Sequence, residues 1–162
     1  MSEVVQRHFT LFMASIEDEI KQSKFRDSYQ KVAVNLLFTA GWLQGKQQEF
    51  FKTYGITTQQ FNILRILRGQ QPKRISGVEI KARMLDRNSD ISRLLDRLLK
   101  KNLIEKHLRP GDKRATDIAI TENGLSLLVE IDKELGARER AMTGLSEAEA
   151  MQLSDLLDKT RG

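Results

Sequence analysis

The sequence predicts a mainly α-helical chain with a small β wing. Apolar residues recur at helical spacing over most of the 162 residues, which is the primary signal of amphipathic helices. Two short β-prone runs, 103–109 and 115–120, flank a Pro-Gly turn and predict one hairpin. The two prolines in the whole chain leave long helices uninterrupted, so we expect one compact chain of helices carrying a hairpin.

Residues 1–56 are expected to form two helices. In the first, over residues 3–22, apolar side chains return every three or four positions: Val5, Phe9, Phe12, Ile16 and Ile20. The second is expected from about Ser28 to Tyr54, with Gly55 as its stop. Each helix presents an apolar stripe that needs a partner.

The region 57–121 opens with two capping signals. Thr57 and Gln60 have the spacing of a capping box and predict a helix that ends near Gly69. Ser76 and Glu79 repeat the pattern and predict a short helix through Arg83. A turn at residues 84–87 follows this helix.

A helix is expected over residues 88–101 with two chemically different sides. One side is apolar, and the other carries hydroxyl, acidic and basic groups: Ser89, Ser92, Arg93, Asp96, Arg97 and Lys100. Two short helices joined by a tight turn, the second cationic on its outer side, are typical of a helix-turn-helix whose second helix enters the DNA major groove.

The hairpin that follows has a basic tip at residues 110–114. Thr121 is expected to cap a helix that runs to about Arg140, and Ser146 with Glu149 to cap a last helix. Residues 73–114 contain 13 lysines and arginines against 6 acids, whereas the rest of the chain has 14 against 16. The positive charge therefore gathers on the proposed DNA-reading region, although a solvated face would have the same composition.

These spaced motifs resemble the winged helix-turn-helix of the MarR (multiple antibiotic resistance regulator) transcription factors. The family pattern of Ser-x-x-(Ser/Thr)-Arg on the recognition helix is matched by Ser89, Ser92 and Arg93. The Asp-x-Arg of the wing is matched by residues 112–114, and the Leu/Ile-Thr-x-x-Gly that opens the next helix by residues 120–124.

The resemblance implies a sequence-specific regulator of double-stranded DNA, usually a repressor. Base readers and nearby contacts are expected at Asn88, Ser89, Ser92, Arg93 and Arg97. Arg114 would enter the minor groove with Asp112 positioning it, and Lys113, Lys100 and Arg87 would contact phosphates without reading sequence.

Three positions depart from the usual family pattern. Asp90 occupies a place where a small neutral residue is common, and either accepts from a cytosine amino group or caps the helix. Lys81 replaces a small apolar residue. Asn102 replaces a glycine, but asparagine tolerates the left-handed conformation expected there.

The resemblance also implies a homodimer, with residues 1–56 and 122–162 interleaving between two subunits; helices folding back on their own chain are the competing reading. A small aromatic or phenolic effector would bind between these helices and the DNA-binding region and release a pseudo-palindromic operator. Candidate crevice residues are Phe38, Trp42, Phe61 and Met84, although aromatic residues and methionine at helical spacing are more often plain core. With no cysteine in the chain, thiol redox sensing and thiol metal sites are excluded.

Other classes of function find little support. No HExxH, GxSxG or glycine-rich phosphate loop is present, and His8 and His107 are far apart in sequence, so an enzyme, a catalytic metal or a cofactor is not expected. No run approaches bilayer length and no signal-peptide pattern is visible, which favours a cytoplasmic protein without membrane contact. The remaining alternative is a helical protein-interaction module whose winged region does not bind DNA.

Overall fold

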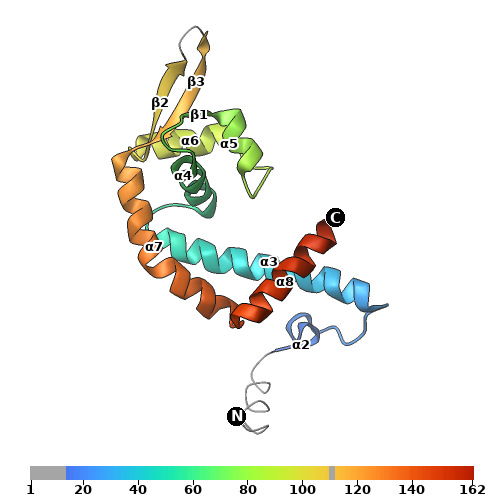
Figure 1. Cartoon of the computed structure of the whole chain (residues 1–162). Helices are drawn as coiled ribbons and strands as arrows, with labels where there is room; N and C mark the ends of the chain where they lie inside the picture. The colour runs from blue at the N-terminus through green and yellow to red at the C-terminus, as the bar shows by residue number, and fades with distance from the viewer. Residues whose placement is uncertain (1–13, 110–111) are drawn as a thin grey trace. The chain divides into compact units, whose positions relative to one another are not determined.

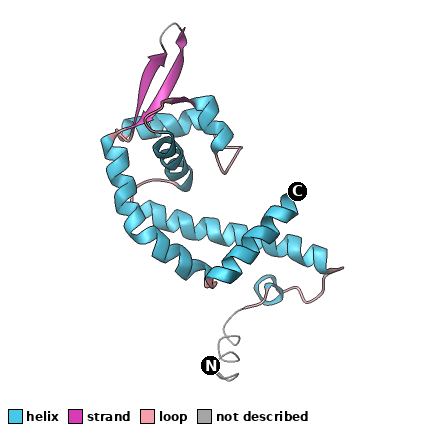
Figure 2. Ribbon diagram, in the orientation of Figure 1, coloured by secondary structure: helices cyan, strands magenta, loops and turns pink. Residues whose placement is uncertain are grey.

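The computed structural model describes residues 14–109 and 112–162, and the side chains of these except 109 and 112–115. The chain forms two compact units, Met1–Phe50 and Phe51–Gly162. Figures 1 and 2 show their helices and strands. No described helix is both long enough and apolar enough to cross a membrane.

The described part of the first unit consists of α2 (Ile16–Ile20) and most of α3 (Ser28–Thr53). Of the helix expected over residues 3–22, only this last part is described, and Val5, Phe9 and Phe12 lie outside the described residues. The helix ends earlier than expected because Lys21 adopts a left-handed conformation with φ of 53°. Lys31 of α3 pairs with Glu17 of α2 at 2.5 Å.

The α3 helix has the predicted bounds to within one residue and stops where Gly55 turns with φ of 69°. Much of its apolar surface is uncovered in the first unit, as Tyr29, Val32, Leu37, Phe38 and Trp42 are all exposed. A helix with such a surface has apolar area left for a partner.

The second unit contains α4 (Thr58–Gln70), α5 (Gly77–Arg83), α6 (Ile91–Lys100), α7 (Glu122–Thr143) and α8 (Glu147–Arg161). Four predicted helix starts are confirmed: the side chains of Thr57, Ser76, Thr121 and Ser146 each accept from a backbone amide three residues on. Each cap satisfies an amide that the first turn leaves unbonded.

A three-stranded antiparallel sheet, ordered β1-β3-β2, joins these helices. It comprises β1 (Ile75–Ser76), β2 (Ile104–Arg109) and β3 (Asp112–Ile120). In the register, Ile104 faces Ile120 and Ile75 faces Ile118. Figure 2 shows the β2–β3 hairpin extending away from α4, α5 and α6 of the same unit.

The sheet differs from the prediction in two respects. The strand β1 was not expected, because two residues have no periodicity and their pairing with β3 comes from a distant segment. The basic segment 112–114 was placed in the turn, but β3 begins at Asp112. Backbone pairing continues there through a register shift beside Arg109, since ladder hydrogen bonds do not require apolar side chains.

The core of the second unit lies between the sheet and the helices α4 to α7. Its completely or almost completely buried side chains come from every one of these helices and from all three strands: Ile63, Leu64, Leu67, Ile75, Ile80, Leu98, Ile104, Ile118, Leu128 and Ile131. The core holds one side of α6 against the sheet and leaves its other side to solvent.

Candidate nucleic-acid interface

The helix α6 presents one buried and one exposed side. Ile91, Leu95 and Leu98 are buried. The exposed side carries Asp96 and the α6 residues expected to meet DNA, which are Ser92, Arg93, Arg97 and Lys100. The packing of three apolar residues thus determines which side of the helix a ligand can reach.

The start of α6 differs from the prediction, which began the helix at Asn88. Asp86 accepts from the Asn88 amide at 2.9 Å and from the Ser89 hydroxyl at 2.9 Å, and this side-chain bonding stabilises a turn in place of a helix. Asn88 and Ser89 therefore lie in the turn before the helix, and the Ser89 hydroxyl donates its hydrogen to Asp86.

Asp90 is the N-cap of α6. Its Oδ1 accepts from the Arg93 backbone amide at 3.1 Å. Of the two roles considered for this carboxylate, capping is the one that the geometry supports.

The acidic and basic side chains on the exposed side of α6 differ in whether they have a partner within the protein. Asp96 Oδ1 lies 3.1 Å from Nζ of Lys106 on β2, so the acid of the exposed side has a cationic partner. The side chains of Arg93, Arg97 and Lys100, in contrast, have no hydrogen bond or ion pair among the described residues. The exposed side of α6 therefore offers three cations for an external anion.

A hollow of about 230 Å³ lies between the start of α4 and the first half of α6. Thr57 and Gln59 line it at the start of α4, and Arg93, Leu94 and Arg97 line it from α6. Asp86, Ser89 and Asp90 line it from the turn and cap before α6, so two carboxylates offset the two arginines in this hollow. The capping box predicted where α4 begins, but nothing in the sequence indicated that this start faces the arginines of α6.

Residues 56–116 match the model of the MarR family. The chain is 30% identical over 111 residues to the HTH-type transcriptional regulator PecS of Dickeya dadantii, covering 67% of each chain. The chain belongs to the MarR family of transcription regulators. A MarR transcription factor from Planctomyces limnophilus has the same fold, with a TM-score of 0.65 and 28% identity over 83% of this chain and 98% of that one.

The fold is also shared with a mutant of MarR from E. coli that was crystallised in complex with operator DNA. That structure matches with a TM-score of 0.67 and 24% identity, and the alignment covers 83% of this chain and 98% of the other. In MarR-family terms, α5 and α6 form the helix-turn-helix, and the β2–β3 hairpin forms the wing.

Other MarR-motif residues also have defined places. Asn102 follows α6 with φ of 54°, as expected for the position of the family glycine. Its carbonyl accepts from Thr121 Oγ1 at 2.7 Å. Asp112, Lys113 and Arg114 lie on β3, and their side chains are outside the described part, so the wing-positioning role of Asp112 stays a prediction.

The four candidate crevice residues belong to different units. Phe38 and Trp42 lie on α3 in the first unit. In the second unit, Phe61 stacks on Phe51 with ring centroids 4.2 Å apart, and Met84 is buried. Neither the hollow beside the start of α4 nor a larger cavity at the other end of α6 is lined by any of the four.

Proposed function

We propose that this MarR-family chain binds double-stranded DNA sequence-specifically and regulates transcription, most simply as a repressor. The observation that carries the proposal is the unequal pairing on α6: Asp90 caps the helix and Asp96 pairs with Lys106, whereas Arg93 and Arg97 have no described partner. Two exposed cations one helical turn apart repel each other slightly, and the phosphate backbone of DNA would neutralise them.

The contacts divide into readers and anchors. Arg93, Arg97 and Ser92 lie on the exposed side of α6, where a guanidinium can bond a guanine edge and a hydroxyl can bond several bases. Asn88 and Ser89 lie beside the helix start and fit phosphate contacts.

The wing would contribute the remaining contacts. Arg114 would enter the minor groove beside Asp112, and Lys113 would meet phosphate. A mutant of E. coli MarR, which has the same fold, was crystallised with operator DNA, and this supports DNA binding by the fold.

A homodimer is part of the proposal. On α8 no residue is buried, and the apolar residues Met151, Leu153 and Leu156 are 65%, 45% and 53% exposed. Together with the uncovered apolar residues of α3, this surface favours terminal helices, residues 1–56 and 122–162, that pack against a second copy. Two DNA-binding regions about 34 Å apart would then read the halves of a pseudo-palindrome.

Release by a small aromatic or phenolic effector is proposed from the family resemblance. DNA requires one spacing of the two recognition helices. A ligand that binds more tightly to a dimer with another spacing would weaken DNA binding, and the ratio of its affinities for the two forms limits the effect. Phe38, Trp42, Phe61 and Met84 remain the residues proposed for it.

Selection of bound fragments from the source genome tests DNA reading directly. We expect the fragments to share an inverted repeat. Arg93→Ala should weaken binding to that repeat by about 1–3 kcal/mol and relax the base preference.

Lys113→Ala should weaken binding to all DNA sequences alike. It should also reduce, by about one, the slope of log affinity against log salt concentration. Arg26→Ala is the control, because this exposed arginine precedes α3 and its side chain pairs, among the residues that the structure describes, with its neighbour Asp27 alone.

Fragments without a common motif, bound no more tightly than random DNA, would contradict sequence reading. That result would favour the protein-interaction alternative.

A further inference from the structure

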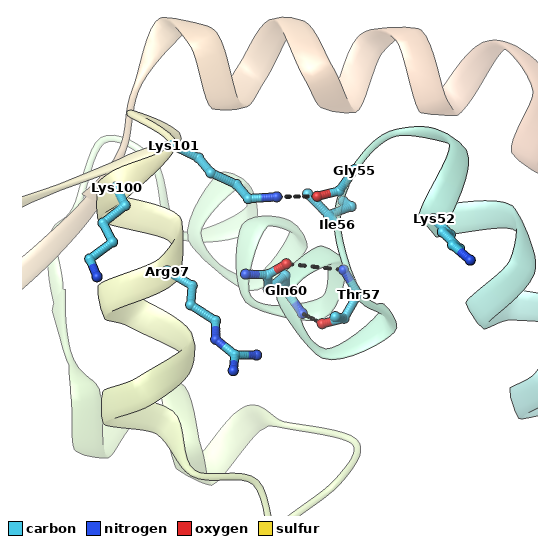
Figure 3. A pocket seen from close by; sticks show the side chains of 8 residues that line it. All are labelled: Lys52, Gly55, Ile56, Thr57, Gln60, Arg97, Lys100 and Lys101. Carbon is cyan, nitrogen blue, oxygen red and sulfur yellow. Dashed lines mark hydrogen bonds between the residues drawn. The ribbon is translucent and has the colours of Figure 1, made fainter.

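A second cavity, with a volume of about 460 Å³, lies between the turn that follows α3 and the C-terminal half of α6 (Figure 3). All of its lining residues belong to the second unit: Lys52, Gly55, Ile56, Thr57, Gln60, Arg97, Lys100 and Lys101. Of these, only Arg97 and Lys100 are also on the side of α6 that is proposed to face DNA.

The lining is strongly cationic. Four of its eight residues are lysine or arginine, and none is aspartate or glutamate. Lys101 donates to the Gly55 carbonyl (Figure 3), whereas Lys52, Arg97 and Lys100 have no side-chain bond to any described residue. Like charges gathered around one hollow repel each other, and an anion between them would relieve the repulsion.

Gln60 adds a polar group to the same cavity. The residue is only 3% exposed, and its Oε1 accepts from the Thr57 amide at 3.0 Å. Its side-chain nitrogen has no acceptor among the described residues, and Figure 3 shows this nitrogen on the side of α6, opposite that bond. This nitrogen is therefore available to a ligand in the cavity as a hydrogen-bond donor.

We propose that this cavity binds a small dianion of the phosphate-monoester class. A phosphoryl group has several acceptor oxygens for the Gln60 amide and the surrounding ammonium and guanidinium groups, and its double charge suits four cations better than a single carboxylate would. The volume also accommodates an organic portion larger than the phosphate itself. The methylene stems of the lysines and Ile56 would contact that portion.

The proposed ligand would oppose DNA binding. Arg97 lines the cavity and is also a proposed base reader, so a phosphate that draws its guanidinium inward removes it from DNA. By thermodynamic linkage, bound DNA must lower the affinity for the ligand by the same factor as the ligand lowers the affinity for DNA. This coupling, unlike the anion site itself, rests on the proposed function.

Binding of inorganic phosphate to the free full-length protein tests the site without DNA. Calorimetry near neutral pH, with sodium chloride adjusted to hold ionic strength constant, should give saturable binding of phosphate and none of acetate. Lys52→Gln should weaken phosphate binding about tenfold. Lys46→Gln, which removes an exposed lysine from the same helix, should leave the binding unchanged.

Lys101→Gln provides a second arm, because it removes both a cavity cation and the bond to Gly55. It should weaken phosphate binding, and a thermal unfolding curve would show whether the variant is folded. Heat that depends on ionic strength alone, or phosphate binding that survives Lys52→Gln at full strength, would overturn the proposal.

A DNA titration separates the two sources of phosphate. If Lys52→Gln lowers the salt slope of DNA binding and the free protein takes up no inorganic phosphate saturably, the cavity serves the DNA backbone and the small-ligand proposal is wrong. Saturable phosphate binding by a protein that reads no DNA would instead leave the anion site intact and refute the proposed function.

Discussion

The ammonium group of Lys106 on β2 lies 3.1 Å from Oδ1 of Asp96 on α6. The wing thus supplies a cation to the acid of the recognition helix, on the side proposed to face DNA. Both side chains reach solvent, with 38% of the Lys106 surface and 62% of the Asp96 surface accessible, so the pair contributes little to folding. The pair mainly affects the local electrostatic potential, because the Lys106 ammonium offsets the Asp96 carboxylate, which would otherwise repel phosphate.

Asp96→Asn should therefore strengthen DNA binding. Removing one negative charge near the backbone is expected to increase affinity by roughly 0.5–1 kcal/mol, or about two- to fivefold, at low salt. Fluorescence anisotropy on the selected operator, at two salt concentrations, measures this change. The control is Asp155→Asn on α8, and a loss of affinity in Asp96→Asn would mean that the carboxylate orients a DNA contact.

Asp90→Ala should destabilise the protein by about 1 kcal/mol, because the first turn of α6 loses the acceptor for the Arg93 amide. Asp90→Ser should retain most of the stability, as a hydroxyl caps equally well. Urea unfolding of the wild-type protein and both variants gives these differences. If Asp90→Ser keeps stability but loses discrimination at one cytosine, the carboxylate also reads a base.

Two glycines of α7 should respond oppositely to alanine. A Cβ at Gly124 would lie 2.3 Å from the Leu103 carbonyl oxygen and 2.7 Å from Cγ1 of Ile120. Both atoms are in the packed core, so Gly124→Ala should cost about 1–3 kcal/mol. A Cβ at Gly136 would meet nothing nearer than Arg140 Nη1 at 3.9 Å, and Gly136→Ala should stabilise by about 0.4–1 kcal/mol.

Thermal or urea unfolding of both glycine variants checks the contrast. Equal effects at the two positions would show that the close approach of α7 to Leu103 is looser than these distances indicate.

The proposed dimer depends on the apolar side chains of α8. Replacing Leu153 and Leu156 together with glutamate should convert the dimer to monomer, since both side chains would carry charge into the subunit contact. Light scattering after size exclusion measures the mass. Gln71→Glu, at an exposed position outside both terminal segments, should remain dimeric, and a monomeric wild-type protein would remove the dimer from the proposal.

Local sequence patterns were enough to locate the start of most helices. Thr57, Ser76, Thr121 and Ser146 were predicted as caps and are caps, because a capping bond joins residues only three positions apart. The left-handed Asn102 was also predictable, since few residues adopt that conformation readily. The family motifs located the helix-turn-helix and the wing for the same reason: their residues are close in sequence.

Features that depend on residues far apart in sequence could be seen only in the folded chain. The strand β1 exists because Ile75 and Ser76 pair with β3, and no local pattern announces a two-residue strand. The pairing of Asp96 with Lys106 joins a helix to the wing, and the burial of Gln60 brings its amide into a cavity lined by α6. Local bonding rules set the elements, but only packing determines which cations keep a partner and which are left to meet an anion.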